Sequence, residues 1–449
     1  MFHRYGKKGK SSQAKPLKEL TRIVATELLL DDEKRRVLLQ RIEDACSLET
    51  TRYDSLCRVL VHNLVNHCQS LPETSNSYYS QPGGLLDHAL NRTEAALSLF
   101  RRFLIREDSK DELSEEQKLW QYALFSAALL QGIGKLYMDL RVDIFDNSGL
   151  FLKQWNPLLE SLVAVGSHYK YEFQKEGDIE FRRRLNLMLA RWLMPSAGFA
   201  WIASNPQVLT VWLALLNEDP YAAGTLGAIL IRADAIAIQR YFNQLLARNY
   251  GARTGRYSRV STFAGGTPES LSDLEQITGM EFIQWLTKAL EGGRLMINKA
   301  PLFMVPGGLL MSPDVFKLFV REHPEFKNWQ AIQNGFLSLG MHKVGPDGNA
   351  ISRFEQSSNQ QMHSGIVFAD YAVALPDEVG LHQMNTGKSS KISATEFIYQ
   401  AKFNQHFTGQ TSQMAAQSMQ YLNASGQWQQ TAPAAAAALR PGSGALHGV

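Results

Sequence analysis

The sequence has few cysteines and no long uninterrupted run of apolar residues. None of its apolar stretches reaches the roughly 18 uncharged residues that a membrane-spanning helix needs, and no apolar core follows the basic N-terminus as in a secretory signal. We therefore expect a cytoplasmic protein without a membrane span. The three cysteines, Cys46, Cys57 and Cys68, recur every eleven residues. On one helix that is roughly 16 Å, too far for a shared metal, which predicts unbridged thiols.

The sequence also lacks a strong charge of one sign. Its formal net charge is +3, too small to identify a nucleic-acid partner by itself. Basic residues nevertheless gather at Lys7–Lys10, Arg182–Arg184 and Arg253–Arg259. Such clusters are either solvated surface or phosphate contacts. With 449 residues, 45% of them apolar, the chain is long enough for more than one core.

The chain divides into segments of different amino-acid composition and hydrophobic pattern. We predict a basic flexible arm (1–16), a helical domain (17–248), a linker rich in Gly, Ser, Thr and Arg (249–267), a smaller domain (268–378) and a low-complexity tail (379–449). The helical domain is predicted to be all-α. One of its helices follows a capping box, Ser114 with Gln117, and is apolar nearly all round. The predicted fold class is therefore mainly α.

The smaller domain combines helices with short strands. A helix stopped by Gly292 and Gly293 is followed by short strands in "RLMIN" and "LFMVPGGLLM". Ser312 and Pro313 then begin a helix, and a second helix covers Trp329 to Gly340. A hairpin with its turn around Gly345–Gly348 and a final strand follow. This order predicts an α+β winged helix. The tail, rich in Gln, Ala and Ser, is predicted to be disordered.

Three separated stretches of the helical domain hold residues that suit a metal site. His88 lies on an apolar stripe, Asp234 lies among isoleucines and alanines, and "LLQGIGK" holds Gln131 and Gly132 between them. The spacing resembles the HD superfamily of metal phosphohydrolases, in which a His-Asp pair stands where this chain has Gln131 and Gly132. Imidazole and carboxylate ligands hold divalent ions that generate hydroxide and bind phosphoryl oxygen. Gln is a poor ligand and Gly is none.

A longer series of stretches carries a second, more specific resemblance. "LPETSNSYYSQPGGLLDHAL", "ALFSAALLQGIGK", "SHYKYEF", "LMPSAGFAWI" and "ILIRADAIAI", followed by "FIQWLTKALEGGRLMINK" and "VPGGLLMSPDVFKLF", occur in this order. They resemble the TraI-type relaxases of the MOBH group, carried by integrative conjugative elements and often labelled helicases. The resemblance covers roughly residues 55–375. It implies paired histidines where this chain has Tyr78 and Tyr79, so two parts of the implied metal centre are changed.

The sequence contains no ATP-binding motif of the kind that a helicase requires. A P-loop requires a glycine, four further residues, and then Gly-Lys-Ser/Thr. The Gly387-Lys388-Ser389 tripeptide has His382 at the earlier glycine position. We therefore expect no ATP-driven motor, and whether the chain is an enzyme stays open.

Each candidate site residue has a structural interpretation beside the functional one. His88 is either a metal ligand or a core histidine paired with Asp234 or a carbonyl; Asp234 is either a ligand or the partner of His88, Arg232 or Arg240. His168 is a possible third ligand. Candidate phosphate contacts are Lys327, Lys343 and Arg353 beside the predicted recognition helix, together with Arg182, Arg183 and Arg184.

Three functions follow from these features. The favoured one is a relaxase-like, DNA-binding protein of a conjugative or integrative element, with a degenerate hydrolase centre and no expected cofactor. Its partners would be DNA and conjugative transfer proteins. The second is an active metal-dependent nickase using Mn, Fe or Zn at a reduced site of His88, His168 and Asp234, with Asp87 or Asp139. The third is a scaffold protein that does not bind DNA.

Overall fold

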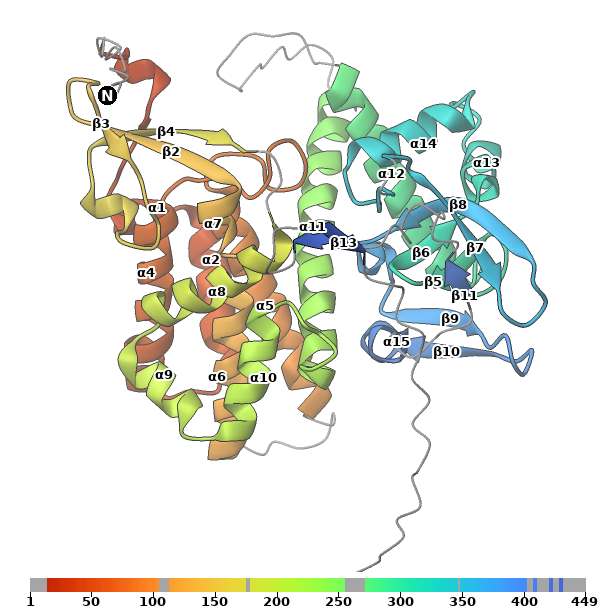
Figure 1. The fold of residues 1–449 in the computed structure, drawn as a ribbon, viewed down its shortest axis with the longest axis horizontal. Coiled ribbons are helices and arrows are strands. Elements are labelled where there is room, and N and C mark those ends of the chain that lie inside the picture. The colour runs from red at the N-terminus through yellow and green to blue at the C-terminus, as the bar shows by residue number, and fades with distance from the viewer. Residues whose placement is uncertain are drawn as a thin grey trace, which may run out of the picture.

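The structure is a computed structural model that describes residues 14–104, 113–174, 178–254, 271–345 and 348–401, with three short strands beyond them (Figure 1). Most of the predicted arm and linker lies outside these residues, although α11 continues to Thr254. We call 14–254 the N-terminal region and 271–401 the C-terminal region. The two stand side by side, with α11 between them (Figure 1).

Helices dominate the N-terminal region, so the predicted class, mainly α, is confirmed. The predicted capping box at Ser114 and Gln117 is present and begins α6, whose burial on nearly all sides places it at the centre of the region. The helices are α1 (Thr26–Leu30), α2 (Glu33–Ala45), α3 (Thr50–Tyr53), α4 (Val59–Cys68), α5 (Gly84–Leu104), α6 (Glu115–Leu130), α7 (Lys135–Met138), α8 (Ile179–Leu193), α9 (Ser196–Ala203), α10 (Pro206–Leu216) and α11 (Gly224–Thr254).

The N-terminal region is not all-α, however. It contains a four-stranded antiparallel sheet in the order β1-β4-β2-β3, where β1 is Thr21–Arg22, β2 Leu140–Phe145, β3 Phe151–Gln154 and β4 His168–Phe173. The prediction was wrong here because these strands are short. Only β2 shows a clear alternation of buried and exposed side chains, while β3 is exposed throughout.

The C-terminal region has the predicted helix, strands, two helices and hairpin, but the two strands before Ser312 are placed differently. The stretch "RLMIN" forms only an isolated bridge at Ile297, and "LFMVPGGLLM" forms both strands. Helix α12 (Leu271–Glu291) ends near Gly293, whose φ of +69° favours glycine. A hairpin of β5 (Leu302–Val305) and β6 (Gly308–Met311) follows, then α13 (Pro313–Glu322), α14 (Trp329–Ser338), β7 (Ile351–Gln356) and β8 (Met362–Phe368). Helices α12 and α14 cross in direct contact, because a Cβ atom on Gly279 would lie 2.2 Å from the carbonyl oxygen of Gly335.

Ordered structure continues into the segment predicted to be a disordered tail. The short helix η4 (Tyr371–Ala374) leads to the hairpin of β9 (Glu378–His382) and β10 (Ser389–Ser393), and then to α15 (Ala394–Ala401). The prediction began the tail too early because the polar composition conceals buried positions such as Val379, Phe397 and Ile398, which join the second core. Gly387 and Lys388 lie in the turn of this hairpin, and Ser389 begins a strand. In a P-loop the Gly-Lys-Ser/Thr tripeptide leads into a helix, so this tripeptide is not part of a P-loop.

Strands β7, β8, β6 and β5 form one sheet, to which β11 (Phe407–Gly409) adds beside β7. Strands β12 (Gln420–Leu422) and β13 (Trp428–Gln430) pair with each other. The β7–β8 hairpin turns after Gln356, whereas the sequence predicted its turn around Gly345–Gly348. Residues 346 and 347 lie outside the described residues.

Helix α11 joins the two regions because it contributes to both cores. Leu230 and Ala233 belong to the core of the N-terminal region, and Ala235, Ile238 and Phe242 to that of the C-terminal region. The helix also carries polar contacts to η4 of the C-terminal region. Arg232, which is buried, donates to the carbonyl oxygens of Ala372 (3.3 Å) and Leu375 (2.8 Å) and pairs with Asp377 (3.2 Å). These contacts place the segment before η4 opposite Asp234.

No single helix among the described residues is long and apolar enough to cross a membrane. Helices α9 and α10 pass that test of length and hydropathy only together, and they bend by 117° at the break between them. The three cysteines are free, as predicted.

Candidate functional site

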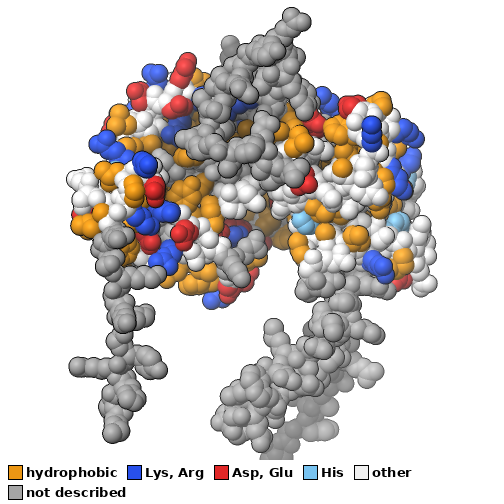
Figure 2. All heavy atoms as spheres, turned by 90° about the horizontal axis from the view of Figure 1, so that it is seen from above, with side chains coloured by type: hydrophobic (Ala, Val, Ile, Leu, Met, Phe, Trp, Pro, Cys, Tyr) orange, Lys and Arg blue, Asp and Glu red, His pale blue; other side chains and the backbone are white. Residues whose placement is uncertain are grey.

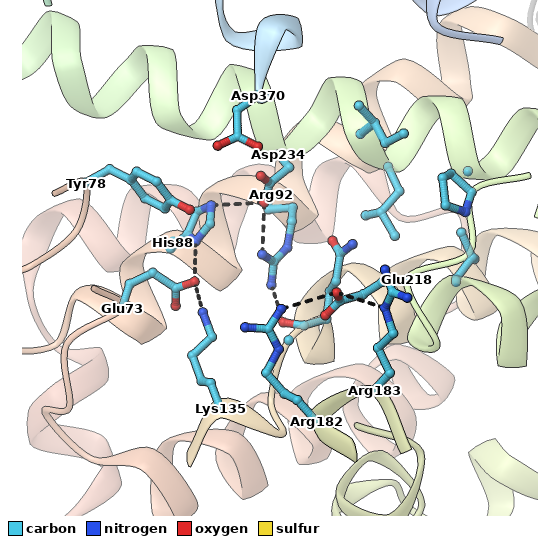
Figure 3. Close-up of a pocket in the computed structure, with 17 residues that line it drawn as sticks. Glu73, Tyr78, His88, Arg92, Lys135, Arg182, Arg183, Glu218, Asp234 and Asp370 are labelled. Atoms are coloured by element: carbon cyan, nitrogen blue, oxygen red, sulfur yellow. Dashed lines mark hydrogen bonds and ion pairs between the residues drawn. The ribbon is translucent and has the colours of Figure 1, made fainter. Parts of the chain in front are cut away.

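The predicted residues His88 and Asp234 meet at the centre of the site (Figure 3). His88 is 2% exposed, in the second turn of α5, and its two ring nitrogens face two carboxylates. Its Nδ1 atom lies 3.1 Å from Oε1 of Glu73, and its Nε2 atom lies 3.1 Å from Oδ1 of Asp234. Burial opposes the charged imidazolium, but Asp234 and Glu73 more than offset it, so the pKa of His88 is raised above its ordinary value.

Two further cations complete the arrangement. Arg92, one turn after His88 on α5, donates to Oδ1 of Asp234 at 3.0 Å and to the carbonyl oxygens of Ala128 (2.7 Å) and Gln131 (3.1 Å). Lys135, at the start of α7, pairs with Glu73. We call the series Lys135–Glu73–His88–Asp234–Arg92 the ion-pair network.

The network keeps its two acids ionised in spite of their burial. Burial alone would raise the pKa of Glu73, yet Lys135 and His88 hold it well below the usual range. The pKa of Asp234 is likewise opposed by burial and lowered by His88 and Arg92. The network therefore stabilises the packing of α5, α7 and α11 only while its acids and bases are charged.

The pH dependence of stability should report this network. Because the folded pKa of His88 is raised, its contribution is complete below its unfolded pKa of about 6.5 and is lost as the pH rises through the folded value. The lowered pKa values of Glu73 and Asp234 have the opposite effect, because their contribution to stability is lost as the pH falls below about 4. We expect the difference in unfolding free energy between wild type and His88→Asn to be largest between about pH 5 and 6.5. Urea unfolding across pH measures it, and a difference that is constant from pH 5 to 9 would contradict the charged His88.

Two tyrosines stand where the relaxase resemblance implies histidines. Tyr79 stacks on the His88 ring with centroids 4.9 Å apart and donates its hydroxyl to the carbonyl oxygen of Ala237 at 2.9 Å. Tyr78 packs edge-on to the same ring at 5.5 Å. Burial raises the pKa of both phenols far above the ordinary value, so both remain neutral. They pack against the histidine and connect it to α11.

Gln131 and Gly132 lie at the wall of the cavity that the ion-pair network borders. Gly132 adopts a φ of +72°, and a Cβ atom there would lie 3.4 Å from Cε and 3.7 Å from Nζ of Lys135. The Gln131 Oε1 atom is buried and has no hydrogen-bond partner among the described residues. The cavity holds about 360 Å³ and is lined by charged groups from both regions, including Arg182, Arg183, Glu218 and Asp370 (Figure 3).

The other residues of the predicted reduced metal site do not line this cavity. His168 begins β4, Asp87 pairs with Arg35 at 2.7 Å, and Asp139 lies 3.7 Å from Arg182. No group of three or more His, Cys, Asp or Glu side chains within the described ranges is arranged to hold a metal ion.

The predicted phosphate contacts are divided between the two regions. Arg182 and Arg183 face the cavity and share Glu218, at 3.5 Å and 3.7 Å, while Arg184 is exposed. Lys327, Lys343 and Arg353 are exposed on the C-terminal region. Their role in binding DNA stays a prediction.

Sequence reasoning missed four residues of the site. Arg92 lies on the same apolar stripe of α5 as His88, where a buried arginine signals a partner carboxylate. Lys135 ends the "LLQGIGK" stretch without any cue that it reaches Glu73. Glu73 and Asp370 lie in loops, where no periodicity marks a side chain that faces the cavity.

The fold and the site define a class of protein: a two-region, mainly helical protein with a histidine–carboxylate centre between α5 and α11, closed on one side by an α+β region. Family models identify it further. One described as "Putative helicase" matches residues 20–262, and one described as "Putative conjugal transfer nickase/helicase TraI C-term" matches residues 277–386. The chain therefore belongs to the TraI-type family of conjugal transfer nickase/helicase proteins. No curated protein matches it.

Proposed function

We propose that this protein is a relaxase-like, DNA-binding component of a conjugative or integrative element in which the metal-hydrolase centre is degenerate. The proposal rests on one observation, the ion-pair network, in which Lys135 and Arg92 supply positive charge to the carboxylates that a metal would need. The family descriptions support the setting of DNA transfer.

A divalent metal does not fit the residues present. Gln131 is a weak ligand and Gly132 offers none, while Glu73 and Asp234 are already neutralised by cationic side chains. Both ring nitrogens of His88 face carboxylates, so neither offers the free lone pair that metal coordination requires. The reduced-site alternative is not favoured, because the structure brings only His88 and Asp234 of its residues together.

The C-terminal region supports the DNA-binding part of the proposal. Its order of one helix, a strand hairpin, two helices and a second hairpin is that of a winged helix, and we place the boundary before it in the predicted linker, after α11 ends at Thr254. Lys327, Lys343 and Arg353 are exposed around α14 and the β7–β8 hairpin. Lys and Arg side chains also gather along the outer edge of this half of the molecule (Figure 2). Such side chains suit phosphate contacts.

The test of DNA binding is its dependence on salt. We expect the protein to bind DNA at about 50 mM salt and to lose affinity steeply by about 200 mM, as phosphate contacts require. The double variant Lys343→Ala, Arg353→Ala should lower the slope of log affinity against log salt by about 2. Fluorescence anisotropy with single- and double-stranded oligonucleotides measures both.

A matched control is Lys153→Ala, an exposed lysine on β3 in the other region that pairs with Glu160. This variant should retain the wild-type slope. Absence of binding to either form of DNA at about 50 mM salt would remove the proposed function and leave the scaffold alternative.

A further inference from the structure

The outer face of α8 is both aromatic and basic. The side chains of Phe181, Met188 and Trp192 are 43%, 60% and 45% exposed. They follow one another at spacings of seven and four residues, so they lie along one face of the helix over roughly 16 Å. Arg184 and Arg191 lie beside them and are also exposed. We call these five residues the α8 face.

Other rings hold the two aromatic side chains of this face in place. Phe181 meets Tyr137 of α7 edge-on, with ring centroids 6.4 Å apart. Trp192 meets the buried ring of His67 edge-on at 5.0 Å, and His67 in turn lies 5.2 Å from Trp155. Each aromatic side chain of the face is therefore fixed from one side, while nearly half of it remains open to solvent. This is the arrangement of a platform on which a flat ring can stack.

The same ring contacts lead to a cavity of about 550 Å³ beside the α8 face. Tyr137 and Trp155 both line this cavity. No carboxylate of the described part of the chain lines it, and its polar lining residues are otherwise Arg141, Gln154, Asn156 and Gln174. Amide and guanidinium groups offer the donors and acceptors that pair with the edges of unpaired bases.

The charge of the α8 face favours a polyanion. Neither Arg184 nor Arg191 has an ion-pair partner within the described ranges. The two carboxylates at the start of α8 are engaged elsewhere: Asp178 accepts backbone N–H groups of the first turn, and Glu180 pairs with Arg183 at 2.6 Å. The phosphates of a nucleic acid would supply the missing anions, and its bases would supply rings that stack.

We propose that the α8 face and the adjoining cavity bind single-stranded DNA. Bases stack on Phe181 and Trp192, phosphates contact Arg184 and Arg191, and an unpaired base enters the cavity. Duplex DNA does not fit, because its bases are stacked on one another and cannot reach the protein rings. The inference rests on the proposed function for the identity of the polymer. It adds a second surface, separate from the basic residues of the C-terminal region.

The experiment measures fluorescence anisotropy of fluorescein-labelled oligothymidine with the full chain. We expect Phe181→Ala and Trp192→Ala each to weaken binding at least about fivefold, the lower range for the loss of one base–aromatic stack. Phe181→Leu should weaken it as much as Phe181→Ala, because leucine keeps the apolar contact but has no ring. Phe181→Tyr and Trp192→Phe, which keep a ring, should retain the wild-type affinity. Phe181 is exposed, so its variants test stacking without disturbing the core.

A matched control is Phe151→Ala on β3. Phe151 is 46% exposed and is likewise supported edge-on by another ring, that of Phe145 at 6.0 Å. It lies outside the α8 face, so its removal should leave the affinity unchanged. The double variant Arg184→Ala, Arg191→Ala should lower the slope of log affinity against log salt by about 1.4, the effect of two phosphate contacts to a single strand.

Three results would overturn the inference. Wild-type affinity for oligothymidine in both Phe181→Leu and Trp192→Ala would show that no base stacks on α8. A loss in Phe181→Ala that Phe181→Leu does not share would assign the face to apolar contact with a protein. An equal loss for duplex DNA would show that the face does not select single strands. Each of these results leaves the proposed function standing, whereas the absence of binding to any DNA would remove the proposed function itself.

Discussion

Replacing Arg92 by alanine is expected to lower the free energy of unfolding by about 3–5 kcal/mol, the cost of breaking a buried ion pair from one side. Arg92 is 5% exposed and makes three hydrogen bonds, to Asp234 and to two carbonyl groups at the end of α6. Without it, the two carbonyls lose their donor, and Asp234 keeps only His88 to balance its charge. Urea unfolding followed by circular dichroism measures the loss.

The matched control for this variant is Arg101→Ala on the same helix. Arg101 is exposed and donates to the carbonyl oxygen of Asp44 at 3.1 Å, so its removal should cost about 1 kcal/mol or less. A loss for Arg92→Ala as small as that of the control would mean that the network contributes no more than a surface pair. Combining Arg92→Ala with Asp234→Asn should cost less than the sum of the single variants, because the second change removes the uncompensated charge.

The sequence predicted the elements that carry strong local signals. The capping box at Ser114, the glycine stop of α12 and the start of α13 at Ser312 and Pro313 follow from side-chain chemistry within a few residues, and the structure contains them. The sheet of the N-terminal region was missed because β1 and β3 gain their stability from partners distant in the sequence. Such pairing leaves little local pattern.

The site could be predicted only where family spacing marks a residue. His88 and Asp234 follow from the resemblance and from a charged side chain among apolar neighbours, and the structure places them 3.1 Å apart. Their other partners depend on tertiary contacts. Asp370 reaches the cavity because Arg232 anchors η4 to α11, a contact between regions that no local pattern encodes.

Metal binding should be recovered only when Lys135 is removed together with the changes at positions 131 and 132. In the double variant Gln131→His, Gly132→Asp, the new carboxylate would lie beside the Lys135 ammonium, since even a Cβ atom at Gly132 is 3.7 Å from Nζ. Aspartate tolerates the φ of +72° better than most residues do, so the backbone is no obstacle. The ammonium would pair with that carboxylate and oppose a divalent ion.

We therefore expect less than about 0.2 equivalents of metal per chain in the wild type and the double variant, and about one in the triple variant with Lys135→Ala, which gains an imidazole and a carboxylate and loses the competing ammonium. Elemental analysis after equilibration with Mn²⁺, Fe²⁺ or Zn²⁺ measures the content. Lys135→Ala alone is the control and should stay empty, because it adds no ligand at positions 131 and 132. Near-stoichiometric metal in the wild type that is lost in His88→Ala would contradict the degenerate centre. It would also make the active nickase the better interpretation. His88 would then be a metal ligand, which requires the ion-pair network to rearrange and release it.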